Sequence, residues 1–124
     1  MIGRLSTVVL DCPDPRALAR FYSKLLGLPI IGDEGVWVDI GDRQGVRISF
    51  QEAPDHEPPR WPDPAFPQQA HLDVLVDDID AAEPKVLALG ATRLPCSGER
   101  FRVYADPAGH PFCLEWGEQE TAAG

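Results

Sequence analysis

Residues 5–27, LSTVVLDCPDPRALARFYSKLLG, join a strand to a helix through an aspartate turn. Apolar and polar side chains alternate along residues 5–12, which predicts a half-buried strand. Asp14 followed by Pro15 is typical of a helix N-terminus, and Gly27 is typical of a helix end. We therefore expect one well-bounded helix between these signals.

The helix in this stretch carries one continuous apolar stripe. Its members recur at spacings of three and four residues: Leu18, Phe21, Tyr22, Leu25 and Leu26. A stripe about 100° wide is typical of a helix that packs against a sheet. Three further strand candidates follow, near residues 29–31, 36–40 and 46–51. Residues 4–52 therefore predict a βαβββ module.

The same pattern returns in the second half of the chain. Thr7 corresponds to His71 and Asp14 to Asp78, with the same separation in sequence for both pairs. Because Pro84 would strain an interior helical turn, we expect the second helix to begin nearer Asp80 than Asp78. Three strand candidates follow it, near residues 92–94, 101–105 and 111–116.

Residues 69–117 therefore predict a second βαβββ module, and the fold class is α+β. We expect one domain over residues 1–124, because the chain is too short for two ordinary domains. The modules are joined by residues 53–68, a proline-rich loop. This loop fits a stiff linker, and it also fits a lid that places Trp61 or Phe66 over a binding cleft.

Composition limits the classes of partner. Twenty acidic and eleven basic residues give a net charge of −9, which disfavours nucleic acid and anionic lipid. No stretch approaches the roughly 18 apolar residues of a membrane span, and the start has too brief an apolar run for a signal peptide, so we expect a cytoplasmic protein. The three cysteines, Cys12, Cys96 and Cys113, lack zinc-site spacing and are expected to be reduced.

The two faces of each predicted strand differ in character. One face is apolar and is expected under a helix; Phe101 and Val103 represent it in the strand at residues 101–105. The other face is either solvated or lines a small-molecule cleft, and Trp37 and Tyr104 favour the cleft. The candidate ligand-binding residues on this face are Thr7, Trp37, Asp39, Arg47, Ser49, Gln51, His71, Asp73, Arg102, Tyr104, Cys113 and Glu115.

Two motifs identify a family resemblance. They are V-x-L-x-x-x-D-P-x-x-L-A-R-F-Y-x-x-L-L-G-L at residues 8–28 and D-P-A-G-H-P-F-C-L-E at residues 106–115. With the paired βαβββ modules, they make the chain resemble the vicinal oxygen chelate superfamily, which includes glyoxalase I, extradiol dioxygenases, fosfomycin-resistance transferases and bleomycin-resistance proteins. PPRWPDP, QQAHLD and GHPFCL are similar to uncharacterised bacterial glyoxalase-like proteins. The resemblance implies a curved mixed sheet around a cleft.

The resemblance also implies where a metal would bind. Catalytic members place ligands on the first and last strands of each half. Thr7 and His71 occupy the first-strand positions, and His71 fits a ligand role. Ser49 and Cys113 occupy the last-strand positions, where the family has an acid. The tentative ligand set for a divalent Fe, Ni, Zn or Mn ion is therefore His71, Glu115 and Gln51. Asp73 or Asp39 would orient His71.

Several functions remain open at this stage. The first is a glyoxalase-like protein that binds a small organic molecule in the cleft, without metal or with metal-assisted lyase, isomerase or dioxygenase chemistry. The second is a metal-free sequestering protein of the bleomycin-resistance type, whose cationic ligands would suit the charge of −9. The third is a regulatory or structural dimer. A homodimer and a closed monomer both fit the sequence.

Overall fold

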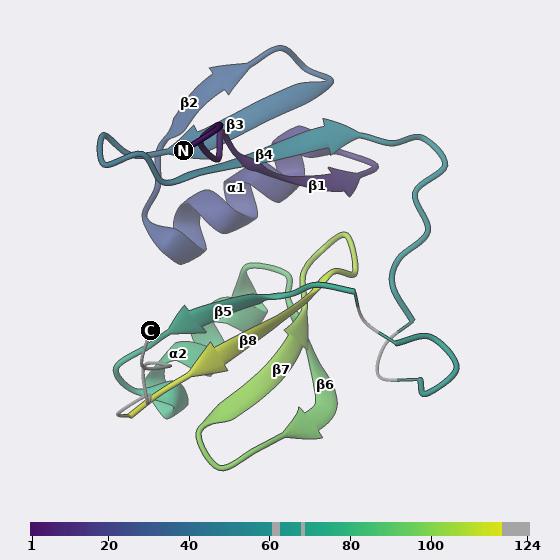
Figure 1. The fold of residues 1–124 in the computed structure, drawn as a ribbon. Helices are drawn as coiled ribbons and strands as arrows, with labels where there is room; N and C mark the ends of the chain where they lie inside the picture. Colours follow the sequence, from purple (N-terminus) through teal and green to yellow (C-terminus); the bar gives the residue numbers. More distant parts are fainter. Residues whose placement is uncertain (61–62, 68, 118–124) are drawn as a thin grey trace. The chain divides into compact units, whose positions relative to one another are not determined.

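The computed structural model describes residues 1–60, 63–67 and 69–117. The chain divides into two compact units, Met1–Glu57 and Pro58–Gly124, which we call the first and second modules. Each module contains one four-stranded mixed sheet and one helix (Figure 1). The predicted α+β class, with two βαβββ units, is confirmed.

The first module follows the predicted element order. Its elements are β1 (Val8–Cys12), α1 (Pro15–Leu26), β2 (Ile30–Asp33), β3 (Trp37–Gly41) and β4 (Arg47–Glu52). The strand order in the sheet is β1-β4-β3-β2. β1 runs parallel to β4, whereas the β4–β3 and β3–β2 pairs are antiparallel. The first and last strands of the module are therefore neighbours.

Helix α1 begins and ends where its sequence signals predict. The Asp14 carboxylate accepts a hydrogen bond from the Ala17 N–H at 3.2 Å, which caps the N-terminus. Gly27 ends the helix in the left-handed conformation, with φ of 68°. Leu18, Phe21 and Tyr22 of the apolar stripe are buried, and the Tyr22 ring stacks on Phe50 of β4 at 5.7 Å between centroids.

The second module repeats this architecture. Its elements are β5 (Leu72–Leu75), α2 (Ile79–Ala88), β6 (Thr92–Ser97), β7 (Phe101–Ala105) and β8 (Pro111–Glu115). The strand order is β5-β8-β7-β6, and β5 again runs parallel to the last strand, β8. Within the described residues, neither helix of the chain is long and apolar enough to cross a membrane.

Helix α2 begins at Ile79, earlier than the start near Asp80 that Pro84 suggested. The Asp78 carboxylate accepts hydrogen bonds from the N–H groups of Asp80 and Ala81, at 3.0 Å and 3.3 Å. This cap stabilises the first turn and offsets part of the cost of the missing Pro84 N–H later in the helix. Asp78 therefore has the same capping role as Asp14, its counterpart in the first module.

The register of the parallel strands extends the duplication from elements to residue pairs. Val9 on β1 pairs with Ser49 on β4, and Asp73 on β5 pairs with Cys113 on β8. The separation in sequence between Val9 and Asp73 equals that between Ser49 and Cys113, and it also equals that between Thr7 and His71. Side chains at corresponding positions of the two modules can therefore be compared directly.

Candidate functional site

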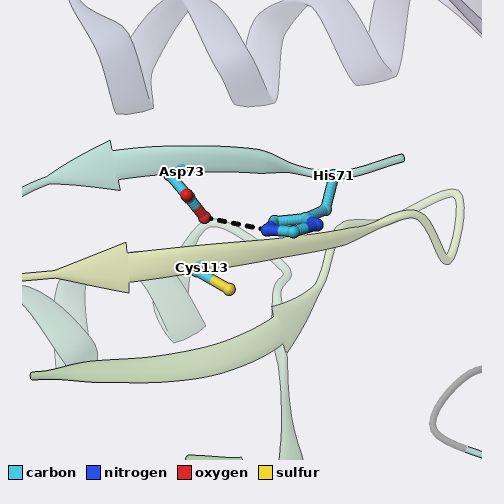
Figure 2. Close-up of side chains that lie close together, drawn as sticks. All are labelled: His71, Asp73 and Cys113. Carbon is cyan, nitrogen blue, oxygen red and sulfur yellow. Dashed lines mark ion pairs between the residues drawn. The ribbon is translucent and has the colours of Figure 1, made fainter. Parts of the chain in front are cut away.

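Three potential metal ligands gather on the face of the second sheet that lies opposite α2, which we call the helix-free face. They are His71, immediately before β5, Asp73 on β5, and Cys113 on β8 (Figure 2). One ligand atom from each residue lies within 4.8 Å of the other two. The His71 Nε2 and Asp73 Oδ1 atoms are 3.1 Å apart. We call these residues the His–Asp–Cys cluster.

Strand geometry explains why these three side chains meet. His71 and Asp73 are separated by a single residue, so their side chains point to the same side of an extended chain. The parallel register places Asp73 beside Cys113. Phe112 and Leu114, on either side of Cys113, are fully buried, and Phe112 stacks on Tyr104 at 5.6 Å beneath α2. The thiol therefore emerges on the helix-free face.

The cluster combines a buried thiol with two accessible partners. The Cys113 residue is 8% exposed, whereas the side chains of His71 and Asp73 are 34% and 48% exposed. Burial, followed by the charge of the adjacent Asp73 carboxylate, raises the pKa of the Cys113 thiol to about 12. The thiol is therefore protonated near neutral pH unless a bound cation displaces its proton.

The chemistry of the cluster fits a divalent transition metal. An imidazole nitrogen, a carboxylate oxygen and a thiolate sulfur are all donors that Zn²⁺ accepts, and thiolate favours softer ions over Mg²⁺ or Ca²⁺. Three protein donors are also the number found in catalytic zinc sites. The donor atoms already lie close enough to surround one ion after small side-chain adjustments.

The observed cluster differs from the ligand set that the family resemblance suggested. Among the described residues, Asp73 and Cys113 lie beside His71, and Glu115 is not part of the group. The physical reason is register: Glu115 pairs with Leu75, which lies about 13 Å along the strand from His71. Gln51 belongs to the first module, and its role as a ligand remains a prediction.

The corresponding positions of the first module carry a chain of hydrogen bonds. The hydroxyl oxygens of Thr7 and Ser49 are 2.7 Å apart, and the Ser49 hydroxyl donates to Asp39 Oδ1 at 2.5 Å. The Trp37 indole N–H donates to the same oxygen at 2.8 Å. Ser49 is completely buried. Where the second module has His71 and Cys113, the first therefore has two neutral hydroxyls that bond to each other.

Strand β7 faces the opposite way from the sequence prediction. The Tyr104 hydroxyl donates to Glu83 of α2 at 2.8 Å, and an Arg102 N–H donates to the same carboxylate at 2.9 Å. Both side chains therefore lie under the helix, and Phe101 and Val103 take the helix-free face instead. The predicted alternation of side chains along β7 was correct, but its two faces were assigned the wrong way round. The polar face can lie under α2 because Glu83 accepts hydrogen bonds from its buried groups.

The other candidate residues keep their predicted face. Arg47 and Gln51 share it with Ser49 on β4, and both are exposed. Glu115 shares it with Cys113 on β8. Ligand binding by these residues remains a prediction. Glu83 was missed, since no sequence pattern marks one helical glutamate as the partner of Tyr104.

The proline-rich loop is described in part. Trp61, one of the two aromatic residues proposed for a lid, lies outside the described residues. Phe66 is 44% exposed, and the Arg60 guanidinium lies 4.7 Å from its ring centroid. The linker and lid interpretations both remain predictions.

Solved structures with the same fold come from several bacteria. A fosfomycin-resistance protein from Listeria monocytogenes, in complex with Mn(II) and 1S,2S-dihydroxypropylphosphonic acid, has a TM-score of 0.71 at 20% identity, over 97% of this chain and 94% of that one. A glyoxalase/bleomycin resistance protein/dioxygenase family enzyme from Burkholderia phytofirmans PsJN has a TM-score of 0.69 at 21% identity, over 92% and 98%. At these identities the likeness concerns the fold.

A third structural relative is a possible glyoxalase from Bacillus cereus, with a TM-score of 0.68 at 15% identity, over 93% of this chain and 99% of that one. No curated protein matches the sequence. The family model described as a glyoxalase-like domain matches residues 7–115, which include every helix and strand of both modules. The chain therefore belongs to the glyoxalase-like domain family.

Proposed function

We propose that this protein is a metal-dependent enzyme that acts on a small organic molecule, with the metal held by the His–Asp–Cys cluster. One observation carries the proposal: three chemically suitable donor atoms from separate positions lie within 4.8 Å of one another. His71 also stands at a position where catalytic members of the superfamily place a metal ligand. A small oxygen-containing substrate is consistent with this similarity to the catalytic members of the superfamily.

Each residue of the cluster has a distinct role in this proposal. His71 binds through a neutral imidazole nitrogen, and Cys113 binds as the thiolate after losing its proton. Asp73 supplies an anionic oxygen, which offsets the charge of the cation. A divalent metal bound there supplies Lewis-acid polarisation of substrate oxygens, as required for isomerase, lyase or dioxygenase chemistry.

A second candidate function is metal-free binding of a small molecule. The hydrogen-bonded chain from Thr7 to Trp37 favours it, because these groups orient one another without a metal. The protonated Cys113 thiol is likewise compatible with a neutral, hydrogen-bonding surface. This protein would sequester its ligand and leave it chemically unchanged.

Metal binding by defined variants tests the first proposal. Protein purified without chelator is analysed for metal content, then stripped and titrated with Zn²⁺, Fe²⁺, Ni²⁺ and Mn²⁺ in thermal-shift and calorimetric experiments. We expect one ion per chain and a raised melting temperature, because an ion that binds only the folded state stabilises it. Cys113→Ser and His71→Ala should each weaken binding by about tenfold or more.

Two variants serve as matched controls. Cys96→Ser removes a thiol outside the cluster, and Glu115→Gln removes a carboxylate from the same face as Cys113. Both should bind metal as the unmodified protein does. Loss of binding in Glu115→Gln with full binding in Cys113→Ser would overturn the cluster as the ligand set. If no ion binds to the unmodified protein, the metal-free function becomes the better account.

A further inference from the structure

A hollow in the first module has no role in the metal site. It lies where the residues before β1 meet the β3–β4 hairpin, and its volume is about 380 Å³. The residues that line it are Arg4, Leu5, Ser6, Asp42, Gly45, Val46 and Arg47. Its walls therefore combine two arginines, one carboxylate, one hydroxyl and two aliphatic side chains.

The two arginines of the hollow have no acidic partner. Within the part of the chain that the structure describes, neither Arg4 nor Arg47 forms an ion pair or a side-chain hydrogen bond. Other arginines do so: Arg16 pairs with Asp33 at 3.0 Å, while Arg93 and Arg102 both pair with Glu83. In a chain with twenty acidic and eleven basic residues, two neighbouring arginines that form no ion pair are unexpected.

The one carboxylate of the hollow already has hydrogen-bond donors. Asp42 Oδ1 accepts from the N–H groups of Gln44 and Val46, at 2.9 Å and 3.0 Å, and so holds the hairpin turn in shape. Two guanidinium groups against one carboxylate leave the hollow with a local positive charge. The pair of arginines therefore remains available to an incoming anion.

We infer that this hollow binds a small organic anion. Arginine presents a planar fork of donors that matches the oxygens of a carboxylate, phosphate or phosphonate. The Ser6 hydroxyl offers a further donor, and Leu5 and Val46 offer apolar contact to a short carbon chain. The ligand class is thus a compact oxyanion with a small aliphatic body. The inference is independent of the metal site, which involves none of these residues.

Binding measurements with three probes test this site. Malonate, methylphosphonate and inorganic phosphate are titrated into the protein by calorimetry at low ionic strength, with sodium chloride at matched ionic strength as the reference. We expect at least one probe to bind one site per chain. Arg47→Gln should weaken binding by about tenfold or more, and Arg4→Gln should weaken it less, because Arg47 is fixed on a strand whereas Arg4 precedes one.

The hairpin provides a matched control, Arg43→Gln, because Arg43 is an exposed arginine that does not line the hollow. It should bind the anion as the unmodified protein does. Equal loss in Arg43→Gln and Arg47→Gln would mean general charge attraction and would overturn the site, as would binding no stronger than that of chloride. Circular dichroism and zinc titration of Arg47→Gln check its folding separately, so failure here is distinguishable from failure of the metal site.

Discussion

Cys113 should behave as an unusually unreactive thiol. Its pKa is raised to about 12 by burial and by the Asp73 carboxylate, and only the thiolate reacts quickly with alkylating reagents. In metal-free protein, we expect iodoacetamide at pH 8 to modify Cys113 much more slowly than a free thiol. The rate should rise about tenfold for each pH unit up to pH 10.

Peptide mapping by mass spectrometry measures this rate at each cysteine. A free cysteine-containing peptide under the same conditions is the reference for reagent quality, and circular dichroism at each pH checks that the protein stays folded. Rapid and pH-independent labelling of Cys113 would contradict the raised pKa. It would also favour a nucleophilic thiol over a thiol that stays protonated until a metal binds.

At the residue scale, the sequence predicted which strand positions matter better than it predicted which side chains would contact one another. His71 was identified from its place in the repeat, and Cys113 was recognised as standing at a ligand position. What could not be predicted was that Asp73 and Cys113 would meet, because this depends on the register between two strands that are far apart in sequence. Alternation within one strand carries no information about its neighbour.

The contact between α2 and its sheet depends on Glu83. The hydrogen bond from Tyr104, followed by the pairing with Arg93 and Arg102, lowers the pKa of the Glu83 carboxyl. A carboxyl with a lowered folded-state pKa stabilises the protein above its unfolded-state pKa, near pH 4. That contribution is lost as the pH falls through the folded-state value. Stability should therefore decline in acid partly through this residue.

Glu83→Gln tests this dependence. We expect the variant to be less stable at pH 7 by about 1–2 kcal/mol, because the buried Tyr104 hydroxyl and two arginines lose a charged acceptor. The difference should shrink as the pH falls toward 3. Urea unfolding at pH 7, 5 and 3.5 measures it, with Glu99→Gln as a control for an exposed carboxylate. A difference that does not change with pH would contradict the proposed coupling.

Among the elements, helix ends were the most predictable features. Asp14 and Gly27 bound α1 as expected, because capping is a local interaction between neighbours in sequence. The start of α2 was predicted too late, because the helix begins directly after its cap at Asp78 and tolerates Pro84 in its interior. The face of β7 that lies under α2 was predicted wrongly because it depends on a tertiary contact. Tyr104 and Arg102 lie under α2 because Glu83 accepts a hydrogen bond from each of them.

The whole molecule carries a strong excess of negative charge. At −9, repulsion among its carboxylates opposes the compact state, and salt screens such repulsion over a Debye length of about 10 Å at 0.1 M. We expect the melting temperature of metal-free protein to rise by a few degrees between 20 mM and 500 mM sodium chloride. Differential scanning calorimetry measures this shift. A melting temperature that falls with salt would mean that attractive ion pairs dominate.

For the molecule as a whole, the duplication made the fold predictable. The internal repeat indicated the element order of the second module from that of the first, including the strands with weak individual patterns. The same repeat could not show which side chains stand at the corresponding positions of the two modules. These are Thr7 and Ser49 in one module and His71 and Cys113 in the other.

The parallel pairing of β5 with β8 has a consequence for how the second module is made. His71 and Asp73 leave the ribosome early in this module, whereas Cys113 leaves almost last. Closing a loop of this length costs chain entropy that is recovered only when β8 docks between β5 and β7. The ligand cluster can therefore assemble only once β8 has paired with β5, so a nascent or truncated chain that lacks β8 would have no complete set of donors for a metal.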